Sequence, residues 1–338
     1  MKKIYYNTCG LLSIALLLMI VFVFTACNNE WEDEQYEQMI SIKSSPNFQG
    51  VTWRNVKYTA DGTVTYNIPV IVSGSTNNVA DRHVHFELDP DTLAKINVAK
   101  FGQREELYFK QLPEQYYSFP EEITIPKGQN VALLPVTYNL SGIDMVEKWV
   151  LPIRIASREK YDYKVNPRKY YSCILLEPVP FNEFSGNYSG TQLTGWVGDE
   201  TKLKLNSEDH RCYVVNDSTV FFYAGLRSVD YTDRALYKIY FRFTGDDYDA
   251  KHKYVEIWSD NLDMNFNVNK DAIYSVTKTM DATTPNLQHI YITISNIDYD
   301  FVDYTTTSGH PITYHFSGSM TLQRDLDLTT PEEDQNIW

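Results

Sequence analysis

The chain has 338 residues, with 44 acidic residues against 30 Lys and Arg, and its formal net charge is −14. A chain this acidic repels nucleic acid and anionic membrane surfaces, so we expect no nucleic-acid partner. The length suffices for two ordinary domains.

The first 26 residues predict a lipoprotein signal peptide. Lys2 and Lys3 precede an apolar run over residues 11–24, and Ala26 then supplies the small residue of a cleavage site. The run is shorter than the roughly 20 residues of a membrane span, which disfavours an uncleaved anchor helix. We therefore expect Cys27 to carry the lipid and to become the new N-terminus. Residues 27–38 are acidic and predict a tether.

The tract at residues 28–34 (NNEWEDE) resembles the export signal of Bacteroidetes lipoproteins that face the cell exterior. The resemblance implies an outer-membrane protein held at the cell surface by its N-terminal lipid. This location is the expectation against which the rest of the chain is interpreted.

Residues 39–178 predict a β-sandwich of immunoglobulin-like size. Apolar residues alternate with polar ones over residues 64–72, 84–88, 151–155 and 171–175, which is the period of a half-buried strand. Pro69 lies inside the first of these runs and predicts an edge strand. A short helix is expected near residues 90–96, capped by Asp89 or Asp91.

Residues 177–180 (EPVP) predict a stiff extended linker that limits contact between two independently folding domains. After it, residues 179–330 show clean alternation at 237–243, 255–257, 290–294 and 312–316. These strands predict either a second β-sandwich or a closed β-barrel, and the pattern does not separate the two. Residues 331–338 are expected to be a tail, and residues 328–338, which are acidic and contain a proline, are expected to make a poor donor strand.

The chain also resembles a known group. Residues 83–157 are similar to an N-terminal domain of unknown function found in Bacteroidetes lipoproteins of polysaccharide-utilisation loci. Residues 184–324 are similar to the C-terminal domain often paired with it. The motifs that carry the resemblance are residues 83–89, 97, 112–117, 123–128, 149–155, 184–191 (FSGNYSGT), 211–225, 237–243, 280–281 and 312–324 (ITYHFSGSMTLQR). The resemblance implies a surface glycan-binding protein that works beside a TonB-dependent importer.

Sugar binding needs an exposed aromatic face and a few polar groups that hold hydroxyls. The 26 tyrosines offer many such faces, although Tyr is also a favoured strand residue. Among the aromatic residues, Trp53 and Trp149 look like packing residues. The candidate glycan-binding residues are Trp196, Tyr231, Trp258, Asp260 and Asn261. Residues 195–199 (GWVGD) predict a loop that contains Trp196, whereas Trp258 falls opposite the alternating core residues of its strand. Each could instead cover the edge of a hydrophobic core.

Metal and cofactor sites receive little support. His83, His85 and Glu87 share one strand face, but their pattern is that of a solvent-facing amphipathic strand. Two groups of aspartates, at 246, 247 and 249 and at 298, 300 and 303, are each expected to lie in a loop and could hold structural calcium, but they lack the order of an EF-hand. We therefore expect no cofactor. A disulfide between Cys173 and Cys212 is not expected either.

No motif for nucleophilic or phosphate chemistry is present, and the number of acidic residues alone does not predict a glycosidase. The sequence therefore favours a non-catalytic surface lipoprotein that captures glycan, with the N-terminal domain as a spacer and the C-terminal domain as the binding face. A surface glycoside hydrolase and an adhesin or assembly protein remain the alternatives.

Overall fold

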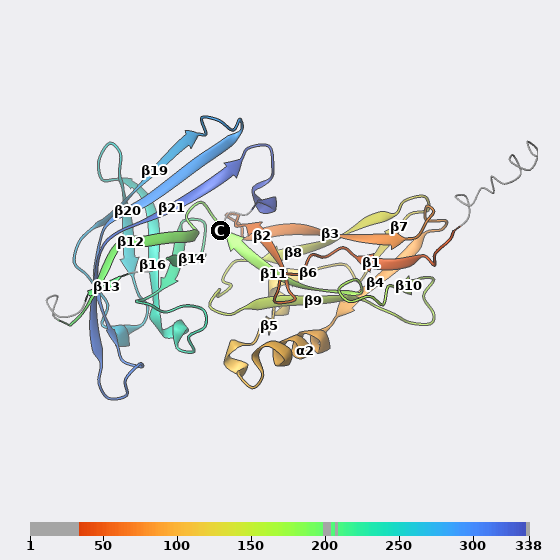
Figure 1. Ribbon diagram of the computed structural model, residues 1–338, viewed down its shortest axis with the longest axis horizontal. Helices are drawn as coiled ribbons and strands as arrows, with labels where there is room; N and C mark the ends of the chain where they lie inside the picture. Colours follow the sequence, from red (N-terminus) through yellow and green to blue (C-terminus); the bar gives the residue numbers. More distant parts are fainter. Residues whose placement is uncertain (1–33, 199–203, 207–208, 336–338) are drawn as a thin grey trace, which may run out of the picture.

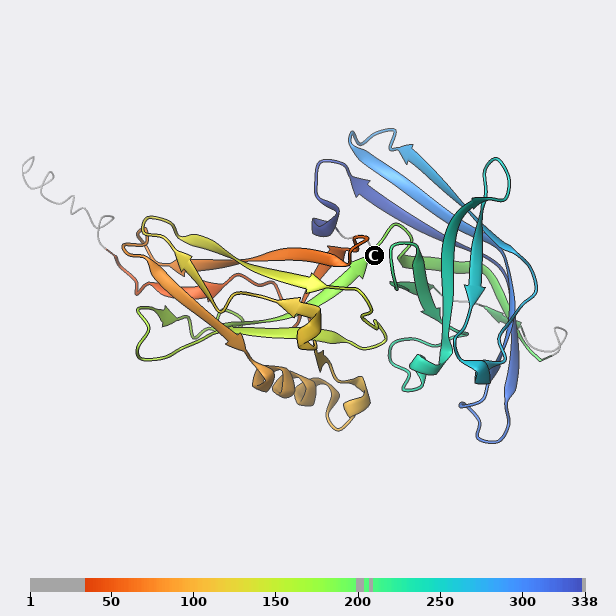
Figure 2. The same cartoon turned by 180° about the vertical axis from the view of Figure 1, so that it is seen from behind.

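The computed structural model describes residues 34–198, 204–206 and 209–335 (Figure 1). Two β-rich lobes lie end to end in an elongated molecule, as Figure 1 and Figure 2 show from opposite sides. The predicted all-β fold with two domains is confirmed. Within the described residues, no helix has the length and apolarity needed to cross a membrane. The predicted signal peptide, Cys27 and most of the acidic tether lie outside the described residues.

The N-terminal lobe is the predicted sandwich of two sheets. Its first sheet has the order β10 (Lys164–Val165), β1 (Met39–Ile42), β3 (Thr63–Ser73), β8 (Val131–Asn139) and β6 (Tyr117–Ser118). Its second sheet has the order β2 (Thr52–Lys57), β11 (Cys173–Phe181), β9 (Trp149–Ile155), β4 (Arg82–Leu88) and β7 (Glu122–Ile125), with β5 (Lys110–Gln111) also paired to β9. Alternate apolar residues of both sheets, such as Ile68, Val84 and Ile153, fill the space between them.

Pro69 does not lie on an edge strand, contrary to the prediction, because β3 pairs with β1 on one side and β8 on the other. The short strand β1 ends at Ile42, whose partner is Val70, so its ladder stops just before Pro69. The Pro69 carbonyl accepts a hydrogen bond from the Lys43 amide at 2.9 Å, which shows that Pro69 directs its backbone groups toward the end of β1. The missing N–H of the proline therefore falls where no ladder bond is needed.

The predicted short helix is present as α2 (Pro90–Phe101), and it continues for more than one turn beyond the expected end at residue 96. The Asp89 side chain caps it by accepting a hydrogen bond from the Thr92 amide at 3.1 Å. The helix covers part of the outer face of the second sheet, where Leu93 packs with Val150 and Leu175. Short 3₁₀ helices, η1 (Glu105–Leu107) and η2 (Glu114–Tyr116), follow it in the connection to β6.

The C-terminal lobe is a closed eight-stranded barrel, which resolves the alternative that the sequence left open. The ring runs in the order β12 (Gly186–Val197), β14 (His210–Val214), β15 (Thr219–Tyr223), β16 (Lys238–Asp247), β17 (Lys253–Trp258), β19 (Ala272–Met280), β20 (Leu287–Asp303) and β21 (Ile312–Asp327), which pairs back to β12. Two short strands, β13 (Lys204–Asn206) and β18 (Asn267–Val268), pair antiparallel with β12 and β20. The 3₁₀ helices of this lobe are η3 (Arg234–Tyr237), η4 (Leu262–Met264) and η5 (Glu332–Asp334).

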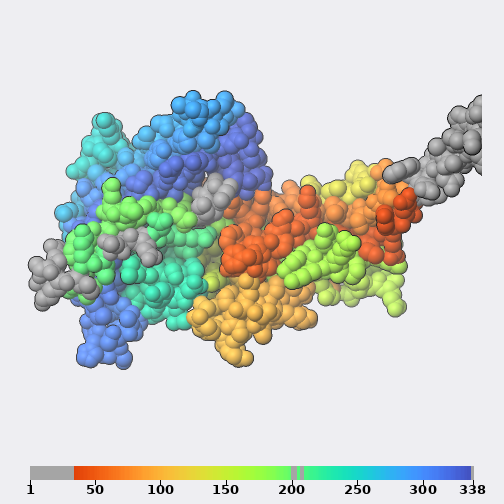
Figure 3. Space-filling model, in the orientation of Figure 1, coloured from red at the N-terminus to blue at the C-terminus, as the bar shows by residue number. Residues whose placement is uncertain are grey.

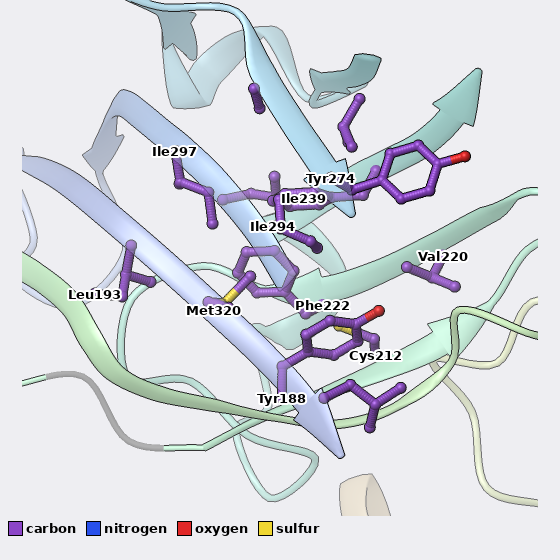
Figure 4. Packing of buried hydrophobic residues seen from close by; sticks show 14 of the residues in the cluster. Tyr188, Leu193, Cys212, Val220, Phe222, Ile239, Tyr274, Ile294, Ile297 and Met320 are labelled. Carbon is purple, nitrogen blue, oxygen red and sulfur yellow. The ribbon is translucent and has the colours of Figure 1, made fainter. Parts of the chain in front are cut away.

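Side chains fill the barrel, so its interior is a core and not a channel. Figure 4 shows Tyr188, Phe222, Ile294 and Met320 packed together inside it. Each of these side chains is almost fully buried. The period-two alternation that the sequence showed in β16 and β20 places every second residue in this core.

The predicted linker at residues 177–180 is not a linker. These residues belong to β11, which pairs in parallel with β2 as far as Phe181. The antiparallel pairing of β11 with β9 ends at Leu176, so Pro178 and Pro180 have a strand on one side only. The Phe181 carbonyl accepts a hydrogen bond from the Tyr58 amide, so the backbone groups of Phe181 face β2. Backbone groups alternate in direction along a strand, and Pro180 and Pro178 precede Phe181 by one and three residues. Their nitrogens therefore point to the side on which β11 has no partner. The chain enters the second domain after Phe181, which is itself buried in the barrel core.

The two lobes are joined by a hydrophobic contact, which corrects the expected separation between domains. Val146 of the N-terminal lobe packs on the outer face of the barrel against Phe221, Tyr223 and Tyr240. We call these four residues, together with the half-buried rings of Tyr213 and Trp258, the junction cluster. The buried guanidinium of Arg234 donates to the Val146 carbonyl at 3.1 Å and fixes its position. The space-filling view shows the lobes meeting along a continuous surface (Figure 3).

The C-terminal segment also connects the lobes. The expected free tail instead folds back, and η5 lies against β2 at the junction (Figure 1). Asp334 pairs with Arg54 at 2.6 Å, and Glu332 pairs with Lys57 at 3.2 Å. Residues 336–338 of the predicted tail lie outside the described residues.

Candidate functional site

Trp258 points away from the barrel core, as predicted from its position in β17. Its ring stacks on Tyr240 with centroids 5.1 Å apart, and it packs in the junction cluster. Its Nε1 donates to Asp260 Oδ1 at 3.0 Å. The face of the strand was therefore predicted correctly, but the ring is half-buried and is covered by Tyr240 of the junction cluster. This placement disfavours Trp258 as a sugar platform.

The polar residues beside Trp258 are divided between structural and open positions. The Asn261 side chain accepts from the Asp263 amide, and its Nδ2 donates to the Leu236 carbonyl at 2.6 Å, so the amide holds η4 in place. Asp260 is exposed and borders a shallow hollow of about 220 Å³. Tyr231 is 47% exposed, and its carbonyl accepts from Arg234. Trp258, Asp260 and Asn261 are brought together, as the sequence indicated.

Trp196 lies elsewhere. It belongs to β12 and not to a loop, and its half-buried ring packs on His315 with centroids 5.3 Å apart. The strand that carries it is four strands away from β17 in either direction round the ring. The five predicted residues therefore do not form one site.

The candidate metal residues are paired with other side chains. His83 and His85 both lie near Glu122, at 3.1 and 3.3 Å, on the outward face that their alternation predicted. Of the aspartates, Asp249 lies 2.9 Å from His252, and Asp298 lies 2.7 Å from Lys270. Asp298, Asp300 and Asp303 lie in β20 and not in a loop, contrary to expectation. Among the described residues, no group of three or more His, Cys, Asp or Glu is arranged to hold a metal.

A groove that the sequence analysis did not identify lies on the flank of the N-terminal lobe. It has a volume of about 550 Å³ and is bordered by β4 of one sheet and β6 of the other. We call it the flank groove, and its principal lining residues are His85, Glu87, Tyr117, Phe119, Arg158 and Tyr161.

Two pairs of stacked rings line the flank groove. His85 stacks on Tyr161 with centroids 4.2 Å apart, and Tyr117 stacks on Phe119 with centroids 5.9 Å apart. All four side chains are half-buried, so the protein holds one part of each ring and leaves the other accessible. Stacked, partly exposed rings are flat apolar surfaces with restricted motion, which lowers the entropy lost when a ligand binds to them.

Local structure explains where these rings lie. Val84 and Phe86 enter the sandwich core, so the alternation of β4 turns His85 outward into the groove. The Tyr163 hydroxyl donates to the Ala156 carbonyl at 2.8 Å and accepts from the His85 amide at 3.1 Å. Tyr163 also stacks on Tyr161 at 5.4 Å, so it anchors the loop that presents the Tyr161 ring.

The polar lining of the flank groove is acidic. Glu87, Glu114 and Glu121 border it together with Arg158. Glu87 accepts from Arg154 at 2.8 Å and from Arg158 at 2.6 Å. Burial opposes ionisation of Glu87, but these two arginines outweigh it and lower its pKa. The groove thus offers carboxyl oxygens as hydrogen-bond acceptors between apolar ring faces.

Trp53 is not the packing residue that the sequence predicted. Its side chain is 50% exposed, whereas Trp149 packs against the sandwich core as expected. The free cysteines agree with the sequence analysis, since Cys173 and Cys212 form no disulfide.

The fold and its grooves define the chain as a two-lobe, all-β protein, and comparison with known proteins gives its family. A domain of unknown function (DUF4973) matches residues 31–160, and a family model for a C-terminal domain matches residues 172–321. A search of curated proteins found no match.

Solved structures are similar over nearly the whole chain. A protein of unknown function from Bacteroides ovatus is 46% identical, with a TM-score of 0.82, and the match covers 88% of this chain and 96% of that one. A multidomain protein including DUF1735, also from Bacteroides ovatus, is 36% identical, with a TM-score of 0.78 and coverage of 89% and 100%. An auxiliary nutrient binding protein from Bacteroides thetaiotaomicron is 34% identical, with a TM-score of 0.75 and coverage of 88% and 99%. The chain belongs to this family of two-domain Bacteroides proteins.

Proposed function

We propose that this protein binds neutral glycan chains at the cell surface without cleaving them. The observation that carries the proposal is the flank groove, in which two stacked aromatic pairs lie beside carboxylates. Pyranose rings stack on such faces, and their hydroxyls donate to carboxylate oxygens. The acidic lining repels uronic or sulfated sugars, so neutral glycans are the favoured ligands. A family relative called an auxiliary nutrient binding protein is consistent with this role.

The lowered pKa of Glu87 makes it unsuited to the role of general acid in a glycosidase. A glycosidase needs one carboxyl group that remains protonated at the working pH. The two arginines that lower the pKa of Glu87 favour its ionised form, which suits hydrogen-bond acceptance better than acid catalysis. The groove therefore supports capture, and the binding face moves from the expected C-terminal domain to the N-terminal one.

The proposed setting is the outer face of the outer membrane, with a lipid on Cys27 and delivery of glycan to a TonB-dependent importer. The signal-like residues 1–26 and the acidic tract after them support it. Tethered copies would raise the effective concentration of binding sites, so that weak single sites are sufficient.

The anchoring proposal predicts that Cys27→Ala abolishes outer-membrane attachment. The variant protein should be soluble or remain an unprocessed precursor, because the thiol that accepts the lipid is absent. Fractionation with detection of the protein in each fraction measures this, and unchanged outer-membrane localisation would contradict it. Surface exposure is tested separately with proteinase K on intact and lysed cells. Protein that survives in intact cells but not in lysates would face the periplasm.

The binding proposal predicts that Tyr161→Ala weakens glycan binding about fivefold or more, since one stacking face is worth about 1–3 kcal/mol. Residues 28–338 would be screened by affinity electrophoresis against soluble neutral polysaccharides, namely mannan, xylan, pullulan and galactan. Tyr248→Ala is the matched control, because Tyr248 is 48% exposed on the barrel, outside the groove. Equal retardation of both variants would contradict the flank groove. Shortening of a retained polymer during incubation would instead indicate a hydrolase.

A further inference from the structure

A second groove lies where the two lobes meet. It has a volume of about 350 Å³, within the range of roughly 300–1,000 Å³ that small-molecule sites occupy. Its walls come from three parts of the chain, since Trp53, Asn55 and Val179 belong to the N-terminal lobe, Arg211 belongs to the barrel, and Glu333 and Asp334 belong to the folded-back tail. We call it the junction groove. It exists only when the lobes and the tail are assembled.

Trp53 is the most exposed tryptophan of the described N-terminal lobe, and its orientation is fixed. It lies opposite Glu177 in the β2–β11 ladder, and its Nε1 donates to Glu177 Oε2 at 2.8 Å. The ring is 50% exposed on the outer face of the sheet, beyond the part that α2 covers. The Trp53 ring is therefore a fixed aromatic face that borders the junction groove, and the apolar face of a sugar ring can stack on it.

The partner of Trp53 is a carboxyl group whose ionised form is disfavoured by burial. Glu177 is partly buried, and this burial raises its pKa to about 7, although the hydrogen bond from Trp53 and the charges of Arg211 and Lys148 oppose the shift. A carboxylate that is this poorly solvated costs free energy at neutral pH. A glutamine could hold Trp53 without that cost. The pair thus departs from what stability alone would favour, as binding sites commonly do.

The remaining lining of the junction groove has balanced charge and fixed geometry. Arg54 pairs with Asp334 at 2.6 Å and lies over the Tyr66 ring at 4.5 Å. Asn55 Nδ2 donates to the Gln335 carbonyl at 2.9 Å. Two arginines face two acidic residues of the tail, so the groove attracts neither anionic nor cationic sugars strongly.

We infer that the junction groove is a second saccharide site, in which a neutral pyranose stacks on Trp53 and its hydroxyls reach the polar side chains of both lobes and the tail. The inference rests on the proposed function, because it names a second position for the same class of ligand. Two sites on one chain can engage one polymer at once, which raises the overall affinity without any stronger single contact.

The inference predicts that Trp53→Ala lowers the affinity for the retained polysaccharide fivefold or more, and that the double variant with Tyr161→Ala loses binding. With a short oligosaccharide cut from that polysaccharide, calorimetry should give two sites for the wild type and one for each single variant. Trp53→Phe keeps a ring and should retain most of the binding. Since Trp53 lies at the junction, a thermal melt of each variant establishes that the fold is intact.

The outcomes separate this inference from the proposed function. One calorimetric site in the wild type that Tyr161→Ala removes and Trp53→Ala leaves unchanged would overturn the junction site and keep glycan capture. Absence of binding to every polysaccharide of the panel would overturn both. Loss of binding on Trp53→Ala alone, with Tyr161→Ala unchanged, would keep the junction site and remove the flank groove.

Discussion

At the scale of single residues, Glu177 has a measurable consequence for stability. Burial raises its pKa from 4.5 to about 7, so the native state binds the proton more tightly than the unfolded chain does. The resulting stabilisation is complete below about pH 4.5 and is lost as the pH rises through 7. We therefore expect Glu177→Gln to be more stable than the wild type at pH 8, by about 1–3 kcal/mol, and to show no such gain near pH 4.5.

Urea denaturation at both pH values tests this. Glu105→Gln is the control, because Glu105 is an exposed carboxyl group of η1. The free energy of unfolding of this variant should equal that of the wild type at both pH values. A Glu177→Gln variant whose stability runs parallel to that of the wild type from pH 4.5 to pH 8 would contradict the raised pKa.

Single residues also show where the sequence was informative. The period-two alternation correctly turned Trp258 away from the barrel core and His85 away from the sandwich core. It could not tell what covers an outward face, because that depends on the other lobe. Both tryptophans lie on outward faces, but Trp258 packs in the junction cluster, whereas Trp53 is exposed. A signal for the flank groove was present in residues 160–164 (KYDYK), where Tyr161 and Tyr163 alternate with charged residues.

At the scale of elements, local signals predicted those features that local physics determines. The Asp89 cap placed the start of α2, and alternation placed the barrel strands. The prolines of β11 led to the wrong prediction of a linker at residues 177–180. A proline is compatible with a strand wherever its nitrogen faces a side without a partner strand, and the sequence does not show which strands pair.

Barrel closure depends on similar long-range detail. Strand β20 is 17 residues long, and its register with β21 shifts between Ile294 and Ile297. Gly318 of β21 faces Ile297 on one side and Leu193 of β12 on the other, with φ +139. A Cβ at this position would collide with the Gln192 carbonyl, so only glycine permits the close approach of the three strands. Such an approach becomes evident only in the folded molecule.

At the scale of the whole molecule, contacts across the junction connect the two lobes. Arg234 is buried and donates to Val146 across the junction, and Lys238 pairs with Asp144 at 3.3 Å. Phe181 ends a strand of one lobe inside the core of the other. Division of the chain after residue 178 would remove the last residues of β11 from β2 and expose the junction cluster. We therefore expect the intact protein to unfold in a single transition.

Val146→Asp tests this coupling. It places a carboxylate among Phe221, Tyr223 and Tyr240 without a partner, which costs free energy only while the lobes are docked. We expect the single calorimetric transition to split in two and the radius of gyration in solution scattering to rise as the lobes separate. Val98→Asp is the control, since Val98 is 58% exposed on α2 and its replacement should change neither measurement. If Val146→Asp kept one transition at unchanged temperature, the junction cluster would not couple the lobes, and the junction groove would lose the rigid walls on which its binding depends.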